Sequence, residues 1–472
     1  MSANVVLTIL VLFSGFYMAW NIGANDVSNA MGTSVGSGAL TLFKAVIIAG
    51  ILEFCGAFFL GGRVSKTMQQ GIVNPDFFVH DPTILLYGMI SALIATAVWL
   101  QIASYFGWPV STTHAIVGAL LGFGALIGGL HTLHWAQIGN IALSWVISPI
   151  ISALFSYLIF SILQRKVLFT MNPIAATIRL VPVLFFIVLF VFTLSVLFNR
   201  LGSLHFQLSF LKIIGISFTI SSIGSLTSMI ILKKIRLPQS YTPSPNLSQQ
   251  MHSLNKVMRH LQRIKLSSSQ QQREKVKNIL QEVQSYSKEM KNDLSLCKTT
   301  SDYNTVEKIF GLLQIVSASY VAFAHGANDV ANAIGPVAGA LEIIGTGHPS
   351  LTWNTPSWLL AMGGLGIVIG LATWGWRVME TIGKKITQLT PTRGFSAEFG
   401  AAITILIASQ CGMPISTTHC IVGSVLGVGL AKGLSALNIR MLRDIVLSWI
   451  ITLPSSAIVC ILIFYLVQAI FS

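Results

Sequence analysis

The sequence predicts an all-α polytopic membrane protein with two inverted-topology repeats, whose broken or re-entrant helices meet at mid-membrane. Three observations support this fold class. Hydrophobic residues make up 53% of the chain and charged residues only 9%, about a third of the charged share of soluble domains. Apolar runs of roughly 20 residues, the length that crosses a bilayer, recur along the chain. Two polar phrases each occur twice, in the same order.

The apolar runs give the expected spans, six before a long polar stretch and four after it. They lie near Val5–Trp20, Phe43–Leu60, Ile84–Tyr105, Ile138–Leu163, Val181–Phe198, Leu208–Leu232, Ile309–Phe323, Trp358–Trp376, Phe399–Cys411 and Ile445–Ile470.

The duplicated phrases set the domain organisation. Gly-Ala-Asn-Asp begins at Gly23 and again at Gly326, 303 positions later. Pro-x-Ser-Thr-Thr-His begins at Pro109 and again at Pro414, 305 positions later. We therefore expect a first transmembrane repeat at residues 1–164 and a second at 308–472. Between them we expect an additional transmembrane helix pair at 165–232 and a cytoplasmic basic helical insert at 233–307.

The distribution of charge predicts how the repeats are oriented. Residues 233–298 hold 13 Lys and Arg against 4 Asp and Glu. Cytoplasmic loops of membrane proteins carry this bias, so no nucleic-acid partner is needed to explain it. The first repeat then ends on the cytoplasmic side, where the second begins, and copies with an odd number of crossings must be inverted. After a linker at Pro238–Ser248, helical spacing of apolar residues predicts a pair of amphipathic helices.

The Ser-Thr-Thr phrases predict helix starts that can hold an anion. A Pro two residues before a Ser is a helix-start signal. A helix that begins inside the membrane leaves its first N–H groups without partners, and its dipole favours negative charge there. The hydroxyl groups that add donors are those of Ser111, Thr112, Thr113, Ser416, Thr417 and Thr418.

The Gly-Ala-Asn-Asp phrases predict cation sites. An Asp in an apolar span costs roughly 2.5–3.5 kcal/mol on insertion scales, so Asp26 and Asp329 need a partner or a role. Their polar neighbours are amides and hydroxyls, those of Asn25, Ser28, Asn29 and Thr33 and those of Asn328 and Asn332. An all-oxygen set with negative charge suits a hard cation or a proton. The flanking glycines are expected to break the helix and expose further carbonyl ligands.

These phrases together predict cation-coupled uptake of a tetrahedral oxyanion. Four half-helix ends are expected near mid-membrane, two presenting donors to the anion and two presenting carboxylates. A carboxylate repels an anion unless a cation or proton lies between them, so anion binding should require the cation. Glu53 and Glu398 are unduplicated membrane carboxylates and are coupling or gating candidates. His114 and His419 serve either as a proton relay or as bonds across the repeat interface.

The duplicated phrases closely resemble those of the inorganic phosphate transporter (PiT) family of cation–phosphate symporters. The resemblance covers both hydrophobic blocks but not the insert. It implies phosphate as substrate, sodium or protons as the coupling ion, no cofactor and no enzymatic activity, with both termini outside. Carried over residue by residue, it places Asn25 and Asn328 among the phosphate ligands and makes sodium a candidate at the Asp26 and Asp329 sites. Glu53 and Glu398 stand where the family has essential membrane glutamates.

Several alternatives remain open at this level. A cation-coupled sulfate permease is the nearest, because sulfate is also a tetrahedral oxyanion. A membrane enzyme with a Ser nucleophile and a His base lacks a repeated third partner, and a channel would need no ion gradient. The lipid bilayer is the expected surroundings, in the cell membrane or, in a prokaryote, the inner membrane. A homodimer and a cytoplasmic partner of the 233–307 insert are left open.

Overall fold

The computed structural model describes the chain except for residues 1–2, 71, 109, 199–208, 235–245, 268–269, 297–299, 350–353, 377–378, 380–389, 434–438 and 472. Pro109 and most of the predicted linker therefore lie outside the described residues. In the described part every regular element is a helix. Nine of these described helices are long and apolar enough to cross a membrane, which confirms the predicted all-α polytopic class.

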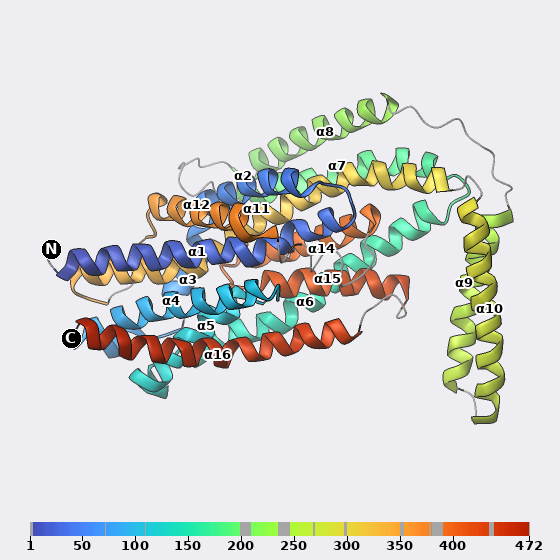
Figure 1. The fold of residues 1–472 in the computed structure, drawn as a ribbon. Coiled ribbons are helices and arrows are strands. Elements are labelled where there is room, and N and C mark those ends of the chain that lie inside the picture. The colour runs from blue at the N-terminus through green and yellow to red at the C-terminus, as the bar shows by residue number, and fades with distance from the viewer. Residues whose placement is uncertain are drawn as a thin grey trace.

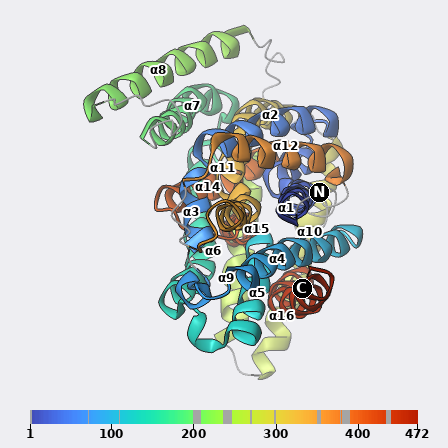
Figure 2. The ribbon, with the colours of Figure 1, turned by 90° about the vertical axis from the view of Figure 1, so that its left-hand side faces the viewer.

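The helices before the insert are arranged as follows. The first block contains α1 (Ala3–Gly36), α2 (Leu42–Leu60), α3 (Gly62–Gln70), α4 (Pro82–Tyr105), α5 (Thr112–Phe123) and α6 (Trp135–Leu163), with short helical turns at Pro75–Phe78, Gly124–Gly128, Leu130–Thr132 and Gln164–Leu168. Next come α7 (Pro173–Phe198) and α8 (Phe210–Lys234), which pack against each other. Figure 2 shows α8 at the outer edge of the bundle, with α7 between it and the rest.

The polar stretch forms a helical hairpin, followed by the second block. The hairpin consists of α9 (Asn246–Ser267) and α10 (Gln270–Leu296). Figure 1 shows it across one end of the bundle, opposite the end where both chain termini lie. The second block contains α11 (Thr300–Thr346), α12 (Ser357–Trp374), α14 (Pro391–Gln410), α15 (Thr417–Lys432) and α16 (Ile439–Phe471).

Helices of the first block pack against helices of the second block in equivalent pairs. Helix α1 packs on α12 and α11 packs on α2, while α5 packs on α16 and α15 packs on α6. Helices α1 and α11 pack against each other and run in opposite directions (Figure 1). This is the pattern that two inverted repeats sharing one interface would give.

Two spans are interrupted where the Ser-Thr-Thr phrases predict it. Helix α4 ends in a turn closed by Trp108 N–H to Ala103 C=O (2.9 Å), with Gly107 at φ 66°. Helix α14 ends identically, with Met413 N–H to Ala408 C=O (2.9 Å) and Gly412 at φ 66°. Only glycine adopts this left-handed conformation readily, so it can end a helix and reverse the chain. Helices α5 and α15 then begin one residue after Ser111 and Ser416.

The predicted break at the Gly-Ala-Asn-Asp phrases is wrong. Helices α1 and α11 run without interruption through both phrases and extend well past the predicted span ends at Trp20 and Phe323. The flanking glycines serve close packing instead: a Cβ on Gly23 would lie 1.9 Å from the Ile367 carbonyl oxygen. The site is therefore built from two half-helix starts and two continuous helices, not from four half-helix ends.

Candidate functional site

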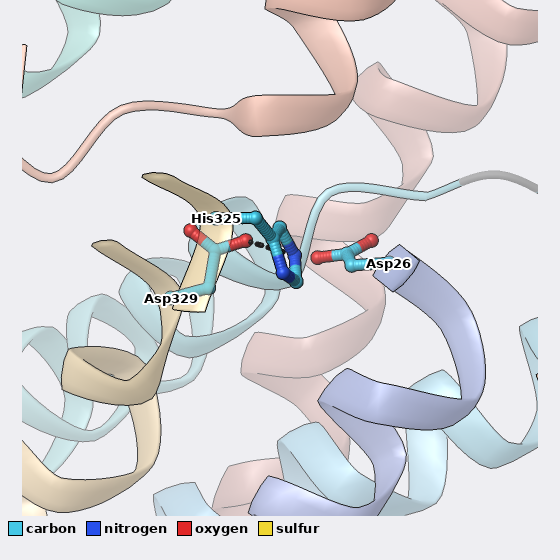
Figure 3. Close-up of side chains that lie close together, drawn as sticks. All are labelled: Asp26, His325 and Asp329. Atoms are coloured by element: carbon cyan, nitrogen blue, oxygen red, sulfur yellow. Dashed lines mark ion pairs between the residues drawn. The ribbon is translucent and has the colours of Figure 1, made fainter. Parts of the chain in front are cut away.

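The two repeated aspartates lie close together at the centre of the bundle. Asp26 on α1 is 1% exposed and Asp329 on α11 is fully buried. His325 lies between them, and one ligand atom from each of the three residues lies within 4.8 Å of the others (Figure 3). Packing of α1 against α11 brings together two phrases that are 303 positions apart in the sequence.

Each aspartate accepts a hydrogen bond from the Ser-Thr-Thr phrase of its own repeat. The Thr112 hydroxyl donates to Asp26 Oδ2 at 2.6 Å, and the Thr417 hydroxyl donates to Asp329 Oδ2 at 2.8 Å. The carboxylates therefore lie at the starts of the half-helices α5 and α15. These starts also carry the N–H groups that have no partner within their helices.

The two half-helix starts are joined across the repeats. Thr113 donates to the Ile415 carbonyl at 2.9 Å, and Thr418 donates to the Val110 carbonyl at 3.2 Å. The amide of Asn29 donates to Thr418 at 2.8 Å, while that of Asn332 donates to Thr113 at 3.1 Å. Hydroxyls and amides from all four segments thus form one buried network.

Ser111 and Ser416 have a local role at these starts. Each hydroxyl accepts a hydrogen bond from the backbone N–H three residues later, that of His114 or His419, at 3.2 Å. This is N-cap geometry, with the capping residue in an extended conformation. The caps hold the first turn in place and leave the N–H groups of the two following threonines at the helix end.

Asn25 and Asn328 use their amide nitrogens in equivalent hydrogen bonds. The amide nitrogen of Asn25 donates to the Ser104 hydroxyl and the Trp108 carbonyl, at 3.0 and 3.1 Å. That of Asn328 makes the matching contacts to Ser409 and Met413, at 3.0 and 3.2 Å. A carbonyl can only accept, so these contacts fix which amide atom is nitrogen. The amide oxygens of both residues, and that of Asn29, are buried without a hydrogen-bond partner.

His325 is a site residue that the sequence analysis missed. Its Nδ1 lies 2.7 Å from Glu53 Oε2, and its Nε2 lies 2.9 Å from Asp329 Oδ2. All three side chains are buried. The available signal was a difference between the repeats, because the position before Gly23 is Ile22 whereas the position before Gly326 is His325. The pairing partner, Glu53, is 272 positions away and could not be read from that difference.

Glu398 lies in a separate cluster of neutral donors between α1, α11 and α14. Its Oε1 accepts from Thr33 (2.5 Å), Ser34 (2.6 Å) and the Gln314 amide (3.0 Å). Its Oε2 accepts from Ser317 at 2.6 Å. Thr33 and Ser34 follow Asp26 by two turns on α1, so the cluster lies toward the hairpin end of the bundle (Figure 1).

His114 and His419 form the centre of an aromatic stack. Their ring centroids are 4.4 Å apart, and each ring lies against a tryptophan: Trp145 at 3.9 Å from His114 and Trp449 at 3.5 Å from His419. His419 Nδ1 lies 3.2 Å from the backbone oxygen of Trp145, which belongs to the other repeat. The structure therefore gives the two histidines a contact across the repeat interface.

Comparison with known proteins identifies the family. The chain matches the Phosphate transporter family over residues 22–460. It belongs to that family. A solved structure titled "The sodium-dependent phosphate transporter" is 34% identical, superposes with a TM-score of 0.77, and is matched over 98% of this chain and 100% of its own.

Curated relatives agree with this family membership. A Chlamydia trachomatis protein named "Putative phosphate permease" is 43% identical over 99% of each chain. "Inorganic phosphate transporter 2-1, chloroplastic" of Arabidopsis thaliana is 42% identical over 96% of this chain and 70% of its own. The chain is thus a multi-pass membrane protein that transports phosphate, and its family is one of transporters rather than enzymes.

Proposed function

We propose that this phosphate transporter is a secondary active symporter that couples phosphate uptake to sodium entry at the network around Asp26 and Asp329. One observation carries the proposal: two buried carboxylates accept hydrogen bonds from the threonines that begin two facing half-helices. Anion-binding and cation-binding groups are therefore in direct contact.

The half-helix starts are suited to the phosphate. The first turns of α5 and α15 carry backbone N–H groups that have no partner within their own helices, and the helix dipoles add positive potential there. The hydroxyls of Ser111, Thr112, Thr113, Ser416, Thr417 and Thr418 frame these turns. The threonines now bound to Asp26 and Asp329 would exchange a carboxylate oxygen for a phosphate oxygen when the substrate arrives.

The unpartnered side-chain oxygens are suited to the cation. Oδ1 of Asn25, Asn29, Asn328 and Asp329 is buried without a donor in each case, and hard cations prefer such oxygens. Asn25 and Asn328 use their amide nitrogens elsewhere, so we assign them to the cation rather than to the phosphate oxygens. Sodium is favoured over the proton because the 34% identical structural relative is named sodium-dependent.

Coupling follows from the repulsion between carboxylates and phosphate. Two like charges 4 Å apart repel by about 4 kcal/mol at the effective dielectric constant of a protein. A cation held between them removes this penalty, so phosphate binds well only when the cation is present. We assign Glu398 a gating or coupling role on the hairpin side of the site. His114 and His419 are assigned to the repeat interface rather than to a proton relay.

Uptake of labelled phosphate into proteoliposomes tests the proposal, with sodium and proton gradients imposed separately. We expect accumulation against the phosphate gradient only when sodium is directed inward. Accumulation driven by the proton gradient alone would show that the coupling ion is a proton and not sodium. Uptake independent of both gradients would indicate a channel. Unlabelled sulfate at equal concentration should compete weakly. Strong competition by sulfate would favour the alternative of a sulfate permease. We propose the cell membrane as the location of the protein.

A further inference from the structure

The acidic site is asymmetric although the phrases that build it are duplicated. His325 on α11 bridges Glu53 on α2 and Asp329 one turn later on its own helix, with contacts of 2.7 and 2.9 Å. The three side chains are fully buried. The sequence offset of 303 between the phrases places Ile22 at the position of His325 in the first repeat.

The position equivalent to Glu53 is also apolar. Gly326 would bring a Cβ to 2.2 Å from the Glu53 carbonyl oxygen, and Gly23 would bring one to 1.9 Å from the Ile367 carbonyl oxygen. Ile367 therefore occupies, against α1, the place that Glu53 occupies against α11. One half of the site contains a Glu–His pair and the other half contains an Ile–Ile pair.

The difference matters for the free oxygens of the two aspartates. Asp26 accepts from Thr112 on Oδ2 at 2.6 Å, and its Oδ1 lies 3.3 Å from the Thr418 hydroxyl and 3.4 Å from the Asn29 amide nitrogen. Asp329 has its contacts on Oδ2, a hydrogen bond from Thr417 and a 2.9 Å ion-pair contact with His325 Nε2 that lies outside hydrogen-bond geometry, and its Oδ1 is buried without a partner. The Glu–His pair thus coincides with the aspartate whose second oxygen is available to a ligand.

We propose that Glu53 and His325 are a positioning pair that fixes Asp329 with Oδ1 directed to the cation. A carboxylate behind a histidine fixes the orientation of its ring, and the ring then fixes what it contacts on the other side. Neither residue needs to touch phosphate for this role. The inference rests on the cation role of Asp329 in the proposed function, and it makes the Asp329 half the stronger cation site.

The test measures the sodium dependence of phosphate uptake in proteoliposomes. The variants are E53Q, H325Q, the double variant E53Q/H325Q, and E53I/H325I, which copies the Ile–Ile pair of the other half. The control is E342Q, a buried acid near the end of α11 that hydrogen-bonds Gln69 at 3.0 Å. E53I/H325I removes both members of the pair together, so neither is left as a buried ionisable group facing an apolar replacement of its partner.

A positioning role predicts a selective change in sodium dependence. Loss of such an outer contact weakens ion binding by about 10–100-fold, so the half-saturating sodium concentration should rise by about tenfold or more. The half-saturating phosphate concentration, measured at saturating sodium, should change by less than about twofold. A purely structural defect would instead lower the uptake rate without changing the sodium dependence more than the phosphate dependence. The double variant E53Q/H325Q should be no worse than either single variant, because the pair acts as a unit.

Three results are decisive. An unchanged sodium curve in E53Q and in E53I/H325I would overturn the positioning role. Loss of uptake at every sodium concentration in folded E53Q would also overturn it, because the pair would then act on the substrate itself. Sodium-independent uptake by the unaltered protein is a different outcome, which removes the proposed function and this inference together.

Discussion

Around Asp26 the side-chain contacts come from hydroxyl and amide groups, whereas around Asp329 they include the His325–Glu53 pair. The contacts from Thr112 to Asp26 and from Thr417 to Asp329 are equivalent. Duplication therefore supplies the symmetric part, which is the two half-helix starts and their carboxylates. Differences between the two copies supply the His325–Glu53 pair, whose ion-pair contact is with Asp329.

The Glu398 cluster shows the same one-sidedness. The offset of 305 between the Ser-Thr-Thr phrases places Leu93 at the position of Glu398, and Leu93 is fully buried. Thr33 and Ser34, which donate to Glu398, correspond to Pro336 and Val337 at the offset of 303. The positions equivalent to Glu398, Thr33 and Ser34 in the other repeat thus carry apolar side chains.

Removing either aspartate charge should have the largest effect. In D26N and in D329N we expect gradient-driven accumulation of phosphate to be abolished, because the cation loses the carboxylate whose oxygen it would bind in that half of the site. The amide keeps the shape of the side chain, so the thermal transition of the purified protein should stay near that of E342Q. Accumulation ratios in proteoliposomes give the measurement. Full accumulation in both variants would contradict the cation role.

E398Q should have the next largest effect. Its amide keeps the shape of the side chain but removes the charge, and hydrogen bonds to a charged acceptor are about twice as strong as neutral ones. A barrier raised by 1.4 kcal/mol slows a step about tenfold, so the initial uptake rate should fall by about tenfold or more. L93M, at the corresponding apolar position, is the matched control, because volume-conserving swaps cost under about 1.5 kcal/mol. An unchanged rate in E398Q would make the cluster a packing feature.

The same comparison explains what the sequence could predict. Helix starts at Thr112 and Thr417 follow from local chemistry, because Ser caps the turn and a preceding Gly ends the previous helix. The two half-helix starts and the fold class were predictable for this reason. The continuity of α1 and α11 was not, because the Asn and Asp side chains find their partners on other helices. His325 and Glu53 pair across 272 positions, and no local pattern encodes such a contact.

Alanine substitutions at the two closely packed glycines should destabilise both halves equally, and they should have the smallest effect on transport. A Cβ on Gly23 or Gly326 would meet a backbone carbonyl at 1.9 or 2.2 Å, and backbone cannot move aside as a flexible side chain can. G23A and G326A should therefore each destabilise the protein by about 1–3 kcal/mol, as overpacking does. Gly139 on α6 has nothing within 4 Å of an added Cβ, so G139A is the control and should be neutral or stabilising by about 0.5–1 kcal/mol.

Thermal unfolding in detergent would measure the loss of stability in G23A and in G326A. The comparison of these two losses is the informative result. Equal losses are expected if helix crossing is the part of the design that both repeats retain. A much larger loss in G326A would mean that the Glu53–His325 pair depends on this crossing for its geometry. In that case its sodium dependence should change in the same direction as in E53Q, whereas that of G23A should not.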